Sequence, residues 1–357
     1  MNKTIKIVLI LAVILLTFVG GYFILKNLVE NNVTDLGQIK TDNETGQPIL
    51  SSSALQQLIF TPIVDYWIQS DNDIYALTET GQVITVKNGE VELINSQTFS
   101  KIHSLAPSFD GEKIILEFNF PDAPRFNIFN TTDGTWQGLP SATRAAAWSP
   151  NSLEIAYLEG NALKILEPKK QTTRTIISIF QPDAQLKWVE PNQILINSYP
   201  SALLTTRIWS LNLKTKSITP FLNETGAVLT WSNDKELALK LRSSAQGSVL
   251  SLFHKTGTQI DLNILTLPEK CELTNNQIYC GVPKIIREGL TLLDDYYQRN
   301  VYFDDNLYLI DLTNGTNSLL LENPGFPIDV SHPKLTSDNQ LLFINRYDNK
   351  LYTLKLK

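Results

Sequence analysis

Residues 145–166, AAAWSPNSLEIAYLEGNALKIL, decide the fold of this 357-residue chain. An apolar anchor, Trp148, is followed by two short runs centred near Ile155 and Ile165, in which apolar and β-branched residues predominate. Short runs of this kind, in which apolar residues alternate with a period of two, are typical of β-strands. The stretch is therefore expected to begin a set of neighbouring strands.

Apolar anchors recur along the chain at a spacing close to 41 residues. Trp67 precedes Ile74 and Ile84 by 7 and 17 residues, the same offsets that Trp148 shows. The anchors are Trp67, Pro107, Trp148, Trp188, Trp231, Leu273 and Leu335, with steps of 40, 41, 40, 43, 42 and 62 residues. A repeat of this length is one supersecondary unit that cannot bury its apolar face alone, so the units must stack or close into a ring.

Turn chemistry distinguishes a β repeat from a helical one. Four dipeptides fall at the same phase, between the third and fourth runs of a unit: Asn88-Gly89, Asp133-Gly134, Thr256-Gly257 and Asn314-Gly315. A tight hairpin needs positive φ angles at such a place. Each unit is thus predicted to be a four-stranded antiparallel meander, and its repetition predicts an all-β fold, a β-propeller.

Residues 145–166 also resemble a known repeat. The stretch is similar to the W-S-P-D-G-x-x-I-A-Y repeat of TolB-type, WD40-like propellers, and residues 229–241 and 105–118 are degenerate copies. The Gly-His and Trp-Asp pairs of true WD40 repeats are missing. The resemblance implies an exported bacterial scaffold and gives no information about catalysis.

The blade count follows from the end of the chain. After Leu335 the sequence supplies three strands, ends in KLYTLKLK, and lacks a fourth. A missing strand would leave a sheet edge exposed. We expect residues 49–60 to supply it, which closes a ring of seven blades; six and eight blades are the competing counts.

The N-terminal region is expected to anchor the protein in a membrane. Ile7 to Leu25 are 19 uncharged residues, which as a helix would rise about 28 Å, close to the hydrocarbon thickness of a bilayer. No A-x-A pattern follows, which favours an uncleaved anchor over a signal peptide. Residues 1–26 are thus a cytoplasmic tip and transmembrane helix, 27–54 a polar stalk, and 55–357 the propeller.

Charge and topology together predict the location. Lys3 and Lys6 precede the span, and this basic bias places the N-terminus inside and the propeller on the extracytoplasmic side. The net charge of −6 disfavours nucleic acid as a partner. We expect a single-pass protein of the cytoplasmic membrane, with a monomer favoured.

The two cysteines are predicted to form a cross-strand pair. Cys271 and Cys280 lie symmetrically about Asn275-Asn276. If those two residues form a hairpin turn, alternation makes the cysteines a non-hydrogen-bonded pair, in which side chains come closest. A disulfide is then feasible and would persist outside the cytoplasm; the alternative is two free thiols.

Signals of catalysis or metal binding are few. The histidines, His103, His254 and His332, lie in different units and show no metal-ligand spacing. Adjacent acids at 294–295 and 304–305 are the best candidates for a paired-carboxylate glycosidase site, although acids in loops are usually solvated. We therefore expect no catalytic residue, no metal and no cofactor.

Arginine and tyrosine residues mark the candidate ligand-binding face. Seven of the eight arginines fall in connections that share one face of the disk in the resembling folds, and residues 283–305, where the step grows to 62, add two tyrosines. The predicted ligand-binding residues are Arg125, Arg144, Arg207, Arg242, Arg287, Tyr296, Tyr297, Arg299 and Arg346. Guanidinium groups suit carboxylates and phosphates; the alternative is a structural rim paired with loop acids.

The insertion itself has two interpretations. Long loops in compact domains are usually functional or mobile, and aromatic and arginine residues are enriched at protein interfaces. The alternative is a lid that packs its own aromatics over the channel. Cysteine-flanked, tyrosine-rich insertions of this kind resemble those of a membrane-anchored bacterial propeller family.

Two functions follow from these expectations. The first is a protein- or peptide-binding scaffold of the cell envelope, whose partner carries anionic groups and docks on the arginine-bearing face. The alternative is a propeller that binds or hydrolyses cell-wall glycan with carboxylates such as Asp294 and Asp304 in the channel mouth.

Overall fold

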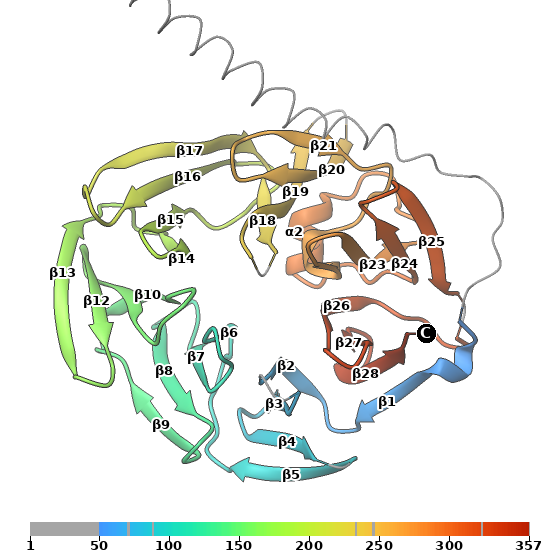
Figure 1. Cartoon of the computed structure of the whole chain (residues 1–357), viewed down its shortest axis with the longest axis horizontal. Coiled ribbons are helices and arrows are strands. Elements are labelled where there is room, and N and C mark those ends of the chain that lie inside the picture. Colours follow the sequence, from blue (N-terminus) through green and yellow to red (C-terminus); the bar gives the residue numbers. More distant parts are fainter. Residues whose placement is uncertain are drawn as a thin grey trace, which may run out of the picture.

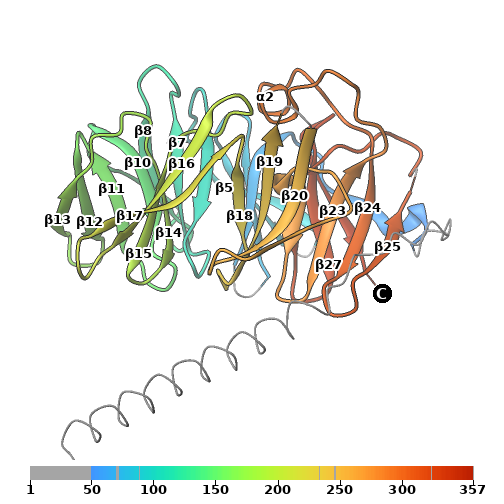
Figure 2. The same ribbon diagram turned by 90° about the horizontal axis from the view of Figure 1, so that it is seen from above.

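The computed structural model describes residues 50–69, 72–87, 89–232, 234–244, 247–322 and 324–356. These residues form seven four-stranded antiparallel sheets, arranged as blades around a common axis (Figure 1). Viewed from the side, they make a flat disk (Figure 2). The predicted all-β propeller of seven blades is confirmed, and counts of six and eight are excluded.

Blades one to three follow the chain in order, and each runs outward from its innermost strand. Blade one holds β2 (Ile63–Ile68), β3 (Ile74–Thr78), β4 (Val83–Lys87) and β5 (Glu90–Asn95). Blade two holds β6 (Ser104–Pro107), β7 (Lys113–Phe118), β8 (Arg125–Asn130) and β9 (Thr135–Gly138). Blade three holds β10 (Thr143–Trp148), β11 (Ile155–Glu159), β12 (Ala162–Glu167) and β13 (Thr172–Ser178).

Blades four to six repeat the arrangement, and the sixth carries two short helices. Blade four holds β14 (Gln185–Glu190), β15 (Gln193–Asn197), β16 (Thr205–Asn212) and β17 (Ile218–Thr225). Blade five holds β18 (Val228–Trp231), β19 (Leu237–Ser244), β20 (Gly247–His254) and β21 (Gln259–Asp261). Blade six holds the 3-10 turn η2 (Pro268–Lys270), β22 (Cys271–Leu273), β23 (Gln277–Pro283), α2 (Leu292–Tyr297), β24 (Asp305–Asp311) and β25 (Thr316–Leu321).

The seventh blade joins the two ends of the propeller. It holds β26 (Val330–Leu335), β27 (Gln340–Asn345) and β28 (Lys350–Lys355), and β1 (Leu55–Ile59) pairs with β28 as the outermost strand. The 3-10 turn η1 (Ser52–Ala54) precedes β1. The closing strand therefore comes from the segment 49–60 that the sequence analysis selects.

The repeated anchors lie mostly between blades. Trp67, Trp148, Trp188, Trp231 and Leu273 are all buried, whereas Pro107 in blade two is exposed. The indole Nε1 of Trp148 donates to the carbonyl oxygen of Ala106 in the preceding blade at 3.0 Å. Burial of such side chains stabilises the ring because it removes large apolar surfaces from water.

The hairpin turns lie where the glycine dipeptides predict them. All four glycines fall between the third and fourth strands of their blades. Gly257 and Gly315 have φ angles of 97° and 70°, which residues with a side chain rarely adopt. Asn88, which precedes Gly89 in the first of the four dipeptides, lies outside the described residues.

Cys271 and Cys280 form a disulfide. They are directly opposite on β22 and β23, with Cα atoms 4.2 Å apart. The amide of Thr274 donates to the carbonyl of Gln277 at 2.9 Å, so the hairpin turn is at Asn275-Asn276. The predicted pairing and register are confirmed.

The predicted membrane anchor at residues 7–25 and the stalk up to residue 49 lie outside the described residues. Within the described ranges, no helix has the length and apolar character needed to cross a bilayer.

Candidate functional site

A cavity of about 780 Å³ follows the axis of the ring. Every blade contributes to its wall through the innermost strand or the residues just before it, which places Val64, Ala106, Ala145, Gln185, Val228, Glu269 and His332 on the lining. Figure 1 shows these strands surrounding the centre of the disk. The cavity is thus a product of the ring itself.

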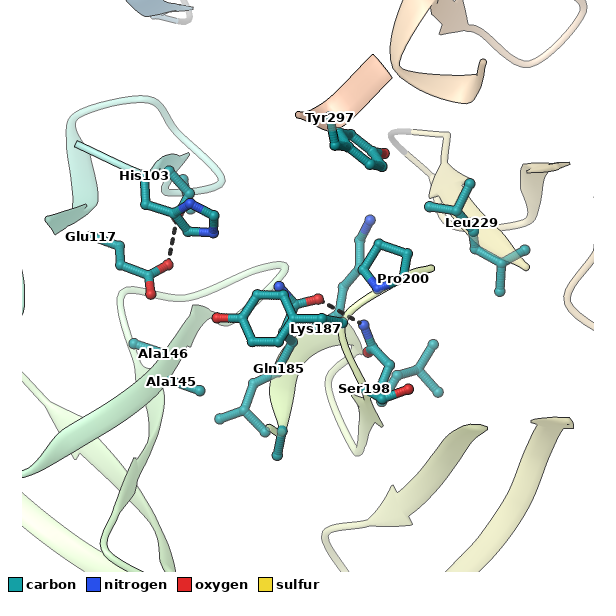
Figure 3. Close-up of a pocket in the computed structure, with 18 of the residues that line it drawn as sticks. His103, Glu117, Ala145, Ala146, Gln185, Lys187, Ser198, Pro200, Leu229 and Tyr297 are labelled. Atoms are coloured by element: carbon teal, nitrogen blue, oxygen red, sulfur yellow. Dashed lines mark hydrogen bonds between the residues drawn. The ribbon is translucent and has the colours of Figure 1, made fainter. Parts of the chain in front are cut away.

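One wall of the cavity, on blades two to four, carries polar and aromatic side chains (Figure 3). His103 stacks on Phe120 with ring centroids 3.8 Å apart, and Tyr199 lies 5.6 Å from the same ring. Desolvation by the surrounding wall lowers the pKa of His103 and raises that of Tyr199 to about 12. Both groups are therefore neutral at neutral pH and offer hydrogen bonds and flat apolar faces.

Glu117 is a buried carboxyl group on the same wall. Its Oε2 accepts a hydrogen bond from the hydroxyl of Ser104 at 2.9 Å, and its Oε1 has no partner among the described residues. Burial raises the pKa of Glu117, and the hydrogen bond from Ser104 opposes that shift. Buried polar atoms are normally hydrogen-bonded, so the free oxygen next to a cavity indicates capacity for a ligand or water.

Arg144 holds the wall together between blades three and four. Its guanidinium group donates to the carbonyl oxygens of Gly160 at 2.6 Å, Gln181 at 3.0 Å and Pro182 at 2.6 Å. These bonds fix the segment that leads into β14. Arg144 is thus first a structural residue, although it also lines the cavity.

Lys187 reaches into the cavity from β14, two residues beyond Gln185 (Figure 3). Burial lowers its pKa to about 8, and the neighbouring charge of Lys235 adds to the effect. The ammonium group is therefore mostly protonated at neutral pH, but it loses its proton more easily than an ordinary lysine does.

The opposite wall belongs to blades six and seven and to the insertion. Tyr297 and Arg299 line the cavity there, together with Glu269 and His332. The side chain of Arg299 donates to Asn349 at 3.3 Å, and Nε2 of His332 lies 3.6 Å from a carboxylate oxygen of Glu269. We define the channel mouth as His103, Arg144, Glu269, Tyr297, Arg299 and His332.

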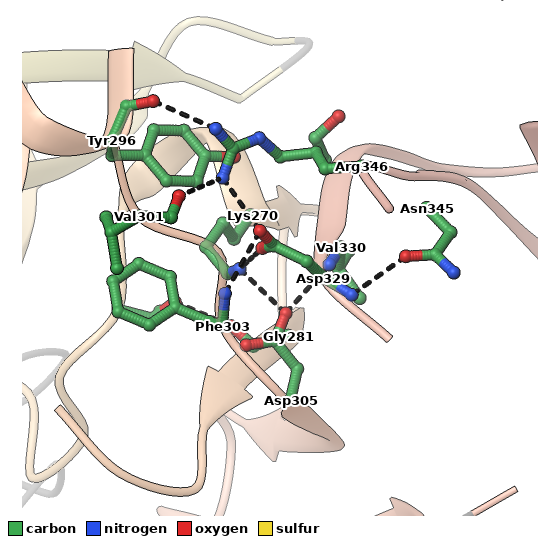
Figure 4. Close-up of polar contacts among 12 residues, drawn as sticks. Lys270, Gly281, Tyr296, Val301, Phe303, Asp305, Asp329, Val330, Asn345 and Arg346 are labelled. Atoms are coloured by element: carbon green, nitrogen blue, oxygen red, sulfur yellow. Dashed lines mark hydrogen bonds and ion pairs between the residues drawn. The ribbon is translucent and has the colours of Figure 1, made fainter. Parts of the chain in front are cut away.

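A buried ion-pair network holds the insertion against blade seven (Figure 4). Asp329 pairs with Lys270 and also with Arg346 at 2.7 Å, and Lys270 lies 2.7 Å from Asp305. The guanidinium group of Arg346 packs 3.8 Å from the ring of Tyr296. These buried charges neutralise one another, so the insertion has a fixed attachment.

The network places α2 beside the cavity. Arg346 donates to the backbone oxygens of Tyr296 at 2.9 Å and Val301 at 3.3 Å. Tyr297, the next residue, is 42% exposed and reaches the lining. The insertion therefore packs as a lid with Tyr296 inside and also presents Tyr297 and Arg299 to the channel.

The structure separates the predicted ligand-binding residues into three groups. Arg144, Tyr297 and Arg299 line the cavity. Tyr296 and Arg346 are buried in the network, 1% and 5% exposed. The remaining four, Arg125, Arg207, Arg242 and Arg287, are not among the lining residues.

The carboxylates proposed for a glycan site also lie away from the cavity lining. Asp294 accepts hydrogen bonds from the hydroxyl of Ser201 at 3.2 Å and the amide of Ala202 at 3.0 Å, and so fixes a neighbouring loop. Asp304 pairs with Lys284 at 2.8 Å. Among the described residues, no group of three or more His, Cys, Asp or Glu side chains could hold a metal ion.

Sequence reasoning missed Glu117, Lys187 and Tyr199, and considered His103 only as a histidine without metal-ligand spacing. Lys187 could have been found, because it precedes the anchor Trp188 on an innermost strand. Glu117 lies within the second strand of its blade and Tyr199 follows the second strand of its own, and no periodic signal distinguishes either residue.

The comparisons with known proteins support the fold and identify no family. No family model matches the sequence, and no curated protein matches it. Among solved structures, virginiamycin B lyase from Staphylococcus aureus is similar with a TM-score of 0.55 and 13% identity, covering 85% of this chain and 99% of that one. The tricorn protease has a TM-score of 0.53 and 11% identity over 88% of this chain and 34% of its own, so this chain spans about a third of its length.

TolB from Acinetobacter baumannii matches more weakly. Its TM-score is 0.43 with 13% identity, covering 71% of this chain and 61% of that one. At identities this low, the likenesses to the lyase and the protease show a shared architecture and leave activity open. The protein is a seven-bladed β-propeller, an architecture that it shares with proteins of several functions.

Proposed function

We propose that this protein is a binding scaffold of the cell envelope that receives a polypeptide segment of a partner at its channel mouth. The observation that carries the proposal is the axial cavity of about 780 Å³, whose wall all seven blades build. Ligand sites in proteins enclose about 300 to 1,000 Å³ and combine apolar walls with a few placed polar groups. The cavity has both properties.

The composition of the mouth supports a polypeptide partner. Tyr297 and Arg299 are exposed at the mouth, and Tyr and Arg are enriched among the residues that dominate protein interfaces. The insertion that carries them is fixed by Asp329 and Arg346, so little ordering free energy is lost when a partner binds. The predicted N-terminal anchor would hold this surface outside the cytoplasm.

Charge reversal inside one insertion tests the proposal. Arg299 and Arg287 are both exposed residues of segment 283–305, but only Arg299 lines the cavity. We expect Arg299→Glu in the full chain to reduce recovery of the partner from host membranes about tenfold, whereas Arg287→Glu leaves it unchanged. Recovery is measured by cross-linking, affinity capture and quantitative mass spectrometry.

The same experiment identifies failure. If wild type and Arg299→Glu recover all proteins equally, the proposal that the partner binds at the channel mouth is wrong. Capture of cell-wall glycan without protein would replace the polypeptide by a saccharide. Thermal unfolding of both variants must match the wild type, because the Arg299 side chain makes one hydrogen bond within the described part of the chain, to Asn349 at the surface.

A further inference from the structure

Lys187 differs from three other lysines that pack in the interior. Lys240, 1% exposed, pairs with Glu224 at 2.9 Å, and Lys270, fully buried, pairs with Asp305 at 2.7 Å. Lys334 donates to the backbone oxygen of Tyr66 at 3.2 Å and lies over its ring. Lys187 is half-buried, and no carboxylate or hydrogen-bond acceptor among the described residues pairs with it.

The charges around Lys187 leave it uncompensated. Glu117 on β7 bonds to Ser104, and Glu269 before β22 lies beside His332. The charge that shifts the pKa of Lys187 is a second cation, Lys235, in the loop after β18. The other ionisable side chains that share the cavity are His103, Arg144, Tyr199, Tyr297 and Arg299.

We propose that Lys187 is the anchoring residue for a carboxylate of the bound polypeptide, which enters through the mouth and ends in the cavity. The proposal rests on the binding function proposed above and specifies its ligand. Lys187 lines the cavity without an acceptor among the described residues, and a carboxylate is the group that most directly supplies one. On the same cavity lining, Arg144 adds positive charge, and the neutral His103 and Tyr199 add hydrogen-bonding groups. Lys235 is a second cation that acts on Lys187, so the surroundings favour an anion over a cation.

The protonation of Lys187 supports this role. Burial and Lys235 lower its pKa to about 8, which is the cost of a cation without a counter-ion. A bound carboxylate would supply that counter-ion. Because only the protonated lysine attracts an anion, affinity should fall as the pH rises through about 8.

A glutamate-rich peptide and its glutamine counterpart test the anchor on the full chain by calorimetric titration. We expect the glutamate peptide to bind, the glutamine peptide to bind about tenfold or more weakly, and Lys187→Met to remove the difference between them. Lys187→Arg should retain binding and remain flat between pH 7 and 9, where the wild type weakens. Lys214→Met, an exposed lysine away from the cavity, is the matched control.

Each outcome decides between the two proposals. Equal binding of the glutamate peptide by wild type and Lys187→Met overturns the proposal that Lys187 binds the carboxylate. If Arg299→Glu loses affinity in the same assay, the channel mouth remains the binding surface. If binding depends on Lys187 but is unchanged by Arg299→Glu, the proposal for Lys187 stands and the proposal for the channel mouth is overturned. An oligouronic acid that binds through Lys187 where the glutamate peptide does not would overturn the polypeptide ligand. Lys187→Met removes a charge that has no partner, so unfolding should show no loss of stability.

Discussion

Asp329 is the residue on which the attachment of the insertion depends. Its carboxylate is fully buried, pairs with Lys270 and Arg346, and accepts the amide of Phe303 at 3.2 Å. We expect Asp329→Asn to lower the free energy of unfolding by about 3 to 5 kcal/mol, because it leaves two buried cations with one remaining carboxylate. Chemical denaturation with an unchanged m-value is the measurement.

The control for this change is an ion pair at the surface. Lys101 and Asp122 pair with exposed side chains, so Asp122→Asn should cost less than about 1 kcal/mol. Equal effects of the two substitutions would contradict a special role for the buried network.

Glu272 gives the propeller a pH-dependent stability. Burial raises its pKa to about 7, although Lys334 and Lys235 act in the opposite direction. A carboxyl group whose folded pKa is raised prefers the protonated form, so its contribution is present below its ordinary pKa and is lost as the pH rises through about 7. The loss is about 1.4 kcal/mol for each pH unit within that window.

Substitution by glutamine isolates this contribution. The unfolding free energy of the wild type, relative to Glu272→Gln, should fall between pH 4.5 and pH 7, and denaturation at several pH values measures it. Glu90→Gln, at an exposed position, should follow the wild type throughout. A constant difference for Glu272→Gln would show that the carboxyl titrates normally in the folded state.

At the scale of elements, β1 and β28 determine whether the ring closes. Ile59 at the end of β1 is fully buried, whereas the next residue, Phe60, is 72% exposed. Ile59→Ala should cost about 2 to 5 kcal/mol through lost burial and the cavity left behind, and Phe60→Ala should cost almost nothing. Denaturation of both variants compares two neighbours that differ mainly in burial. A small effect at Ile59 would mean that closure contributes little to stability.

The insertion, residues 283–305, has features of both interpretations made from the sequence, a lid and a contact surface. Leu292, Leu293 and Tyr296 of α2 are buried and form its packed side, as expected of a lid. Tyr297 and Arg299 lie on the open side at the cavity, as expected of a contact surface. The break in the repeat therefore marks a segment that reaches the cavity, but the sequence did not tell which of its residues are buried and which line the cavity.

At the scale of the whole molecule, the repeat predicted the ring because its signals are local. Trp67 and Trp148 lie at equal offsets from the strands that follow them, and glycine dipeptides lie where hairpins need positive φ angles. The symmetry of Cys271 and Cys280 about Asn275-Asn276 gave the register of one blade. Such patterns involve residues that are close together in the sequence, so they can be recognised in one sequence alone.

The site was less accessible to prediction because its contacts join distant segments. Arg346 pairs with Asp329 and packs on Tyr296, 50 residues away, which no local pattern shows. Glu117 and Lys187 meet the cavity from different blades, and only closure of the ring brings them to one space. Of the seven arginines selected from the sequence, only Arg144 and Arg299 line the cavity, and the charged groups inside the channel became visible only in the folded structure.

The pairing of β1 with β28 places both ends of the described propeller in one sheet, with Leu55 opposite Leu354. In every blade, including the seventh, the outermost strand leads into the innermost strand of the next blade. The first described strand, β1, therefore belongs to the last blade and not to the first. A linker could join these ends and new ends could open in an exposed hairpin such as that at Lys169 and Lys170. A circularly permuted propeller of this kind would keep the same seven blades, channel and mouth.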